Sequence, residues 1–162
     1  MLRELIALDN TSKVWIYQAD REFSYDELDD IREELFPFVD KWSSHGANVP
    51  AYANVFHRRF LCFFADESNM SGVSGCSIDS SVAFVRMIAE KYQVNFFDRM
   101  QYAYMEEEDI KIVHHNDFKP AVDSGEIKQD TLFFDNLVST KDKFLKNWLV
   151  PLEESWHKKM LR

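Results

Sequence analysis

Residues 13–35 read "KVWIYQADREFSYDELDDIREEL", and this stretch changes abruptly from a strand pattern to a helix pattern. Its opening letters, KVWIYQA, are rich in β-branched and aromatic residues, which predicts a strand with two apolar faces. Ser24 and Glu27 have the spacing of a capping box, in which each side chain bonds the other residue's backbone N–H. Phe23 and Leu28 stand at the positions of a hydrophobic staple. The stretch therefore predicts an interior strand followed by a helix with a well-defined start.

The predicted helix keeps its apolar residues at helical spacing past Pro37. Proline removes one backbone donor, so we expect a kink rather than an end at this residue. The letters "SSHGAN" at 43–48 end the helix, and Gly46 suits the left-handed conformation found there. The outer face is acidic, which is typical of a solvated helix surface; a docking surface for a basic partner is the alternative. The apolar stripe consists of Leu28, Ile31, Leu35, Phe38, Val39 and Trp42.

The rest of the chain predicts an α+β fold, mainly an antiparallel sheet with helices packed on it. Its first part follows the β-α-β-β-α-β order of ferredoxin-like folds, and a C-terminal α/β extension comes after it. The segment 59–66 is apolar on both faces and should be a central strand, with Cys62 as a small buried side chain. The chain fits a single domain, 1–162, with a soft subdivision near 115. We expect further strands at 51–57, 101–105, 110–114 and 131–138, helices at 78–92, 140–148 and 152–161, and a short helix that Asn116 or Asp117 caps and Ser124-Gly125 ends.

Composition restricts the partners. The net charge is −9, and no basic run is longer than Arg58-Arg59 or Lys158-Lys159, which disfavours nucleic acid and anionic membrane surfaces. Two cysteines cannot form a disulfide framework. The opening "MLRELIALDN" lacks the apolar core of a signal peptide, and no apolar run reaches the roughly 20 residues that span a bilayer. We therefore expect a cytoplasmic protein with no metal and no cofactor, whose partner is a protein or a small anionic ligand; a homodimer is an alternative.

One candidate site lies in "SGVSGCSIDSSVAF" at 71–84. A helix that begins near Ile78 or Ser80 leaves backbone N–H groups free at its N-terminus, and these bind anions. Asp79 opposes an anion there, because its own carboxylate can cap the helix. A loop that only starts a helix is the interpretation that we favour, because helix starts are commonly rich in glycine and serine without any ligand. The expected ligand-binding residues are Gly72, Ser74, Gly75, Ser77, Ser80 and Ser81.

The same segment suggests a weaker catalytic hypothesis. Cys76 precedes a helix N-terminus, where the dipole favours the thiolate, and the thiolate is the nucleophile. Asp79 could assist it, and His45, His57, His114, His115 or His157 could supply a base through the fold. A buried, inert cysteine is nevertheless the interpretation that we favour for Cys76. The pair His114-His115 invites a metal site, but neighbours on a strand point to opposite faces, which disfavours one.

Several short segments together resemble a small uncharacterised bacterial family of about this length, whose members are often labelled as ABC transporter ATPases. The likeness covers nearly the whole chain, but the sequence contains no Walker A loop, which ATP hydrolysis would need. The resemblance implies no cofactor and no catalytic residue. The segments are "VWIYQ" at 14–18, "WSSHG" at 42–46, "GCSIDSSV" at 75–82, "FFDR" at 96–99, "NLVST" at 136–140 and "SWHK" at 155–158.

A second resemblance concerns residues 116–135. "DFKPAVDSGEIKQDTLFF" is similar to the helix, glycine turn and strand of GYF-type adaptor modules, although the Gly-Tyr-Phe signature is missing. This likeness implies peptide binding. We therefore expect a non-enzymatic binding or protein-interaction domain; the alternative is an enzyme or small-ligand binder that uses the loop 72–81 with Cys76 as a reactive thiol.

Overall fold

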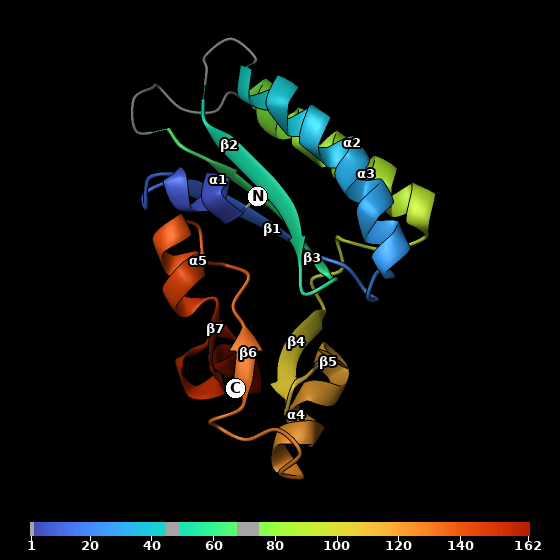
Figure 1. Cartoon of the computed structure of the whole chain (residues 1–162). Coiled ribbons are helices and arrows are strands. Elements are labelled where there is room, and N and C mark those ends of the chain that lie inside the picture. Colours follow the sequence, from blue (N-terminus) through green and yellow to red (C-terminus); the bar gives the residue numbers. More distant parts are fainter. Residues whose placement is uncertain (1, 45–48, 68–74) are drawn as a thin grey trace. The chain divides into compact units, whose positions relative to one another are not determined.

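The computed structural model describes residues 2–44, 49–67 and 75–162 (Figure 1). The chain divides into two compact units. The first consists of Met1–Phe97 together with Ser139–Asp142, and the second of Asp98–Val138 together with Lys143–Arg162. The change from one unit to the other falls between Phe97 and Asp98, so position 115 lies inside the second unit. That all residues form one domain stays a prediction.

The first unit is a three-stranded antiparallel sheet with helices packed on it, as the α+β prediction expected. The strand order is β1-β3-β2, and the central strand β3 is buried at every position. Helices α2 and α3 lie on one face of the sheet and α1 on the other (Figure 1). The helix α1 was not foreseen. The elements are α1 (Leu2–Ala7), β1 (Lys13–Gln18), α2 (Tyr25–Ser44), β2 (Ala51–Phe56), β3 (Phe60–Ala65) and α3 (Gly75–Tyr92).

The start of α2 confirms the predicted capping box. The Glu27 N–H donates to Ser24 Oγ at 3.1 Å, and the Ser24 N–H donates to Glu27 Oε1 at 2.9 Å. Phe23 and Leu28, the predicted staple, are both buried. Pro37 lies inside α2, which continues beyond it to Ser44, so the proline does not end the helix.

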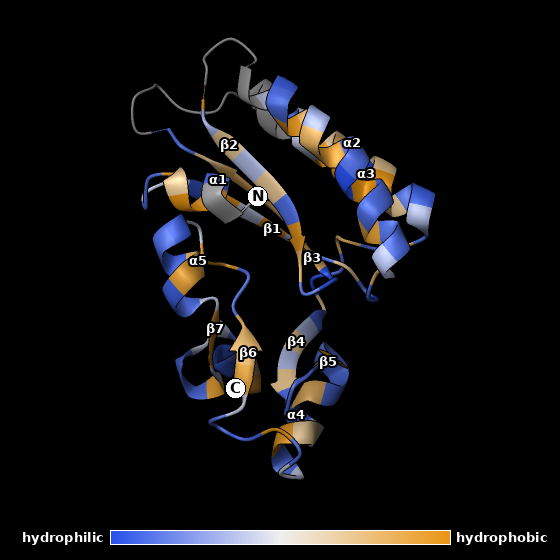
Figure 2. Ribbon diagram, in the orientation of Figure 1, coloured by the Kyte–Doolittle hydropathy of each residue, from blue (hydrophilic) through white to orange (hydrophobic). Residues whose placement is uncertain are grey.

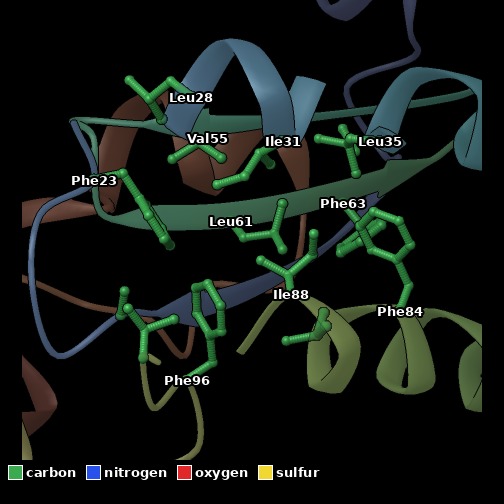
Figure 3. Packing of buried hydrophobic residues seen from close by; sticks show 14 of the residues in the cluster. Phe23, Leu28, Ile31, Leu35, Val55, Leu61, Phe63, Phe84, Ile88 and Phe96 are labelled. Atoms are coloured by element: carbon green, nitrogen blue, oxygen red, sulfur yellow. The ribbon is translucent and has the colours of Figure 1, made fainter. Parts of the chain in front are cut away.

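The main core of the first unit fills the space between the sheet and its two long helices. Figure 3 shows side chains of α2, β3 and α3 pointing toward one another, with Phe23 and Phe96 at one end. Hydrophobic and hydrophilic residues alternate along both helices in Figure 2, as expected of helices with one face on a core. The labelled residues of this core are Phe23, Leu28, Ile31, Leu35, Val55, Leu61, Phe63, Phe84, Ile88 and Phe96.

The strand β2 forms one edge of this sheet, and a side chain pairs with a backbone donor in its middle. The Val55 N–H donates to Asn54 Oδ1 at 2.8 Å, and Arg32 Nε donates to the same oxygen at 3.0 Å. Asn54 Nδ2 donates to the Tyr52 hydroxyl at 2.8 Å. A backbone donor of the edge strand is thus already paired.

The predicted ferredoxin-like order holds for the first three strands and differs at the fourth. The strand at 101 belongs to another sheet, and a distant segment lies beside β1 instead. Thr140 forms an antiparallel bridge with Lys13, and the Val14 N–H donates to the Ser139 carbonyl at 3.1 Å. Sequence patterns of single elements do not reveal such a pairing, because one bridge leaves no periodicity.

The second unit contains a four-stranded antiparallel sheet in the order β5-β4-β6-β7. Its core gathers around Tyr102, Phe118 and Phe133, and the buried imidazole of His157 contacts all three rings. The elements are β4 (Gln101–Glu106), β5 (Asp109–His114), α4 (His115–Asp123), β6 (Leu132–Phe134), α5 (Lys141–Asn147, in this unit from Lys143), β7 (Leu149–Pro151) and two 3₁₀ helices at Leu152–Glu154 and Trp156–Leu161.

Some boundaries in this unit differ from the predictions. The strand expected at 131–138 is only Leu132–Phe134, and β7 was not foreseen. The helix expected at 152–161 is a pair of 3₁₀ helices interrupted at Ser155. Gly125 ends the region of α4 with a φ of 82°, as the glycine turn predicted.

Candidate functional site

The Gly/Ser-rich segment is only partly within the described residues. His45, Gly72 and Ser74 lie outside them. The structure gives the backbone of Gly75, Cys76 and Ser77 as the first turn of α3, and not their side chains. The helix therefore begins at Gly75, earlier than the predicted start near residue 78, so anion binding by this turn stays a prediction.

The later residues of the segment have clear positions. Asp79 and Ser80 are exposed, and Asp79 lies past the first turn of α3, so it is not the N-cap that we expected. Ser81 is only 4% exposed, and its side chain hydrogen-bonds with Tyr17. Burial raises the pKa of Tyr17, and this hydrogen bond partly offsets the rise.

Cys62 is confirmed as a small buried side chain. It is 0% exposed in β3, and burial raises the pKa of its thiol well above the ordinary value. A thiol held neutral in this way is a poor nucleophile.

The histidines have separate partners. His115 Nδ1 hydrogen-bonds with the Tyr102 hydroxyl at 2.7 Å, whereas His114 Nδ1 accepts the Asn116 N–H at 3.0 Å. Within 2–44, 49–67 and 75–162, no three His, Cys, Asp or Glu side chains are grouped to hold a metal ion.

A cleft in the second unit is a site that we did not predict. It arises because β5 passes directly into α4: His114, at the end of the strand, is the N-cap of the helix in place of the predicted Asn116 or Asp117. The helix then ends at Ser124, whose N–H donates to the Pro120 carbonyl at 3.0 Å. One face of α4 is thereby held beside β5, and a cavity of about 420 Å³ lies along it.

We call this cavity the acidic cleft. Its lining combines apolar and polar side chains. Asp117, Pro120, Ala121 and Ser124 supply the wall from α4, at positions i, i+3, i+4 and i+7. That spacing on one helix face is the signal by which the sequence could have revealed the cleft. The remaining lining residues are Tyr104, Ile112, Val113, His114 and Glu126.

Two carboxylates line the acidic cleft, and its described lining contains no lysine or arginine. Neither Asp117 nor Glu126 has a hydrogen bond or ion pair from its carboxylate to any described residue. Burial raises the pKa of Tyr104, and the charges of Glu126 and Glu106 raise it further. The arrangement therefore suits a ligand that is positively charged at one end and apolar along its length.

The part of the chain that the structure describes contains no helix long and apolar enough to cross a membrane. No family model, no curated protein and no solved structure matches this chain.

Proposed function

We propose that this protein is a non-enzymatic protein-interaction domain whose acidic cleft receives a lysine or arginine side chain of a partner chain. The observation that carries the proposal is the pair of carboxylates, Asp117 and Glu126, at an apolar cleft and without a partner among the described residues. Lysine and arginine bury an apolar stem while their charged head stays at a polar rim. Ile112, Pro120 and Ala121 offer apolar contact to such a stem.

Two further observations support a basic partner. A net charge of −9 attracts positively charged chains over a distance, which speeds their encounter. In addition, the residues 117–126 of the cleft fall within 116–135, the segment whose resemblance to GYF-type modules implies peptide binding.

The test is selection of peptides from a random 12-residue phage-displayed library on the immobilised full-length protein. We expect enrichment of peptides that carry lysine or arginine. Synthetic versions of the enriched peptides should bind the double variant Asp117→Asn, Glu126→Gln at least tenfold more weakly, which is about 1.4 kcal/mol for the loss of the charge pairing.

The matched control is Asp130→Asn, because Asp130 is an exposed acid of the same unit that does not line the cleft. This variant should bind the peptides as the unmodified protein does. The proposal is wrong if the library yields no basic enrichment, or if Asp130→Asn weakens binding as much as the cleft variant.

A further inference from the structure

A second cavity lies at the end of the same unit. It has a volume of about 630 Å³ and is formed mainly by the two 3₁₀ helices. We call it the C-terminal cavity. Its lining residues are Gln129, Glu153, Glu154, Ser155, Trp156, Lys158, Lys159, Leu161 and Arg162.

The second 3₁₀ helix is held firmly in place, although it is short. Ser155 Oγ hydrogen-bonds with His157 Nδ1 and accepts the His157 N–H, so it caps the helix. The His157 ring is 2% exposed, and Trp156 stacks on it with ring centroids 4.1 Å apart. The cations that follow are thus carried on a segment anchored in the core.

Unlike the acidic cleft, the C-terminal cavity is lined by lysine and arginine side chains. Lys158, Lys159 and Arg162 have no ion-pair partner among the described residues, and neither have Glu153 and Glu154. The lining thus offers the unpaired ammonium groups of Lys158 and Lys159. The indole N–H of Trp156 is buried and lacks an acceptor among the described residues, which leaves one more donor unpaired in this wall.

The two cavities flank one short connection. Glu126 lines the acidic cleft and Gln129 lines the C-terminal cavity. Three residues of chain span at most about 11 Å, so the Cα atoms of these two residues are no farther apart than that. An extended peptide advances about 3.3 Å per residue, so a segment of a few residues is long enough to extend from Glu126 to Gln129.

We propose that the C-terminal cavity binds a carboxylate of the same peptide, so that the recognised segment carries a basic residue and, about three to six residues away, an acidic residue. This inference rests on the proposed function. The lysine or arginine head pairs with Asp117 and Glu126, and the carboxylate pairs with Lys158 and Lys159. Opposite charges at a fixed spacing would specify both the register and the direction of the bound segment.

The probes are the peptides that the 12-residue library yields, synthesised with their acidic residue and with glutamine in its place. On the unmodified full-length protein, we expect the glutamine version to bind about tenfold more weakly. On the variant Lys158→Gln, Lys159→Gln, the two versions should bind equally, because the partner of the carboxylate is gone. The control Arg99→Gln, Lys111→Gln removes two cations of the same unit outside both cavities and should keep the tenfold difference.

The outcomes separate the two proposals. If no basic peptide is enriched, the proposed function itself fails. If basic peptides bind and depend on Asp117 and Glu126, yet acidic and glutamine versions bind the unmodified protein equally, the function stands and the inference about the C-terminal cavity is overturned. A difference that persists in the Lys158→Gln, Lys159→Gln variant would also overturn it.

Discussion

The ammonium group of Lys141 donates to the carbonyl oxygens of Leu8, at 2.6 Å, and Ile6, at 3.0 Å, across more than 130 residues of chain. Lys141 is 3% exposed. The two carbonyls lie at the end of α1, where backbone acceptors have no partner within the helix. Within the first unit, one lysine therefore ties the segment Ser139–Asp142 to the end of α1, a helix that the sequence did not predict.

Replacing Lys141 by methionine should lower the free energy of unfolding by about 2–3 kcal/mol, because the apolar stem stays and the carbonyls of Leu8 and Ile6 lose a charged donor. Urea denaturation followed by circular dichroism measures the change. The control is Lys143→Met, whose side chain is exposed, and it should change stability by less than about 0.5 kcal/mol. Equal effects of the two variants would contradict this role for Lys141.

His157 should make the protein less stable in mild acid. Burial lowers the pKa of its imidazole from an ordinary 6.5 to about 3, so the unfolded chain binds a proton there that the folded chain does not. The contribution is complete above pH 6.5 and is lost as the pH falls from 6.5 toward 3, by at most about 1.4 kcal/mol per pH unit. Urea denaturation at pH 7 and pH 5 measures this loss.

The comparison for that prediction is His157→Gln. Its stability should fall less between pH 7 and pH 5 than that of the unmodified protein, even though it is less stable throughout. His57, whose pKa burial also lowers, is present in both proteins and cancels in the difference. Parallel pH profiles would show that His157 is not the group responsible.

Glu27 should stabilise the folded chain at neutral pH, and this stabilisation should be lost at a lower pH than that at which the His157 contribution begins to be lost. Arg21 grips both oxygens of Glu27, at 3.0 and 2.8 Å, and with the Ser24 N–H it lowers the pKa of that carboxyl from 4.5 to about 2. A lowered carboxyl pKa stabilises the fold above pH 4.5, and this contribution disappears as the pH falls toward 2. Glu27→Gln should cost about 1–2 kcal/mol at pH 7, whereas Glu33→Gln, on the exposed face of α2, should cost little. A stability loss no larger than that of Glu33→Gln would argue against the charged pairing of Arg21 with Glu27 as a stabilising feature.

The thiols offer a test of the alternative site at 72–81. Cys62 should remain unmodified by iodoacetamide in the native protein, because it is buried and its thiol is held neutral. If Cys76 is the reactive thiol of the alternative hypothesis, mass spectrometry should find one adduct, on Cys76, that forms well below pH 8. No adduct before denaturation would leave that hypothesis without support, and an adduct on Cys62 would contradict its burial.

Local chemistry accounts for what could be predicted. Ser24, Glu27 and Phe23 act over a few residues, and the uniformly apolar β3 is central because no polar position lets it face water. The failures involve distant partners: Thr140 meets Lys13, and β7 pairs with β6 through three residues each. Pairings of one to three residues are too short to produce a periodic pattern of apolar residues in the sequence.

The candidate site was missed for a different reason. The cysteine, glycines and serines of 71–84 predicted a reactive or ligand-binding segment, but Ser81 in this segment is buried and hydrogen-bonds with Tyr17. The acidic cleft instead depends on four ordinary residues of α4 and on the return of that helix beside β5, which His114 brings about as its cap. A histidine in that capping role is unusual enough that spacing rules do not anticipate it.

Asn54 lies on an edge strand of the three-stranded sheet and bears on how two copies of the protein could pair through that edge. The amide oxygen of Asn54 accepts the Val55 N–H. A second copy that approached this edge of the sheet could therefore not form a backbone hydrogen bond with that N–H. Fibril-like stacking needs consecutive backbone N–H and C=O groups that are free to pair with another chain. A single polar side chain on β2 thus removes one backbone donor that edge-to-edge pairing of two copies would use.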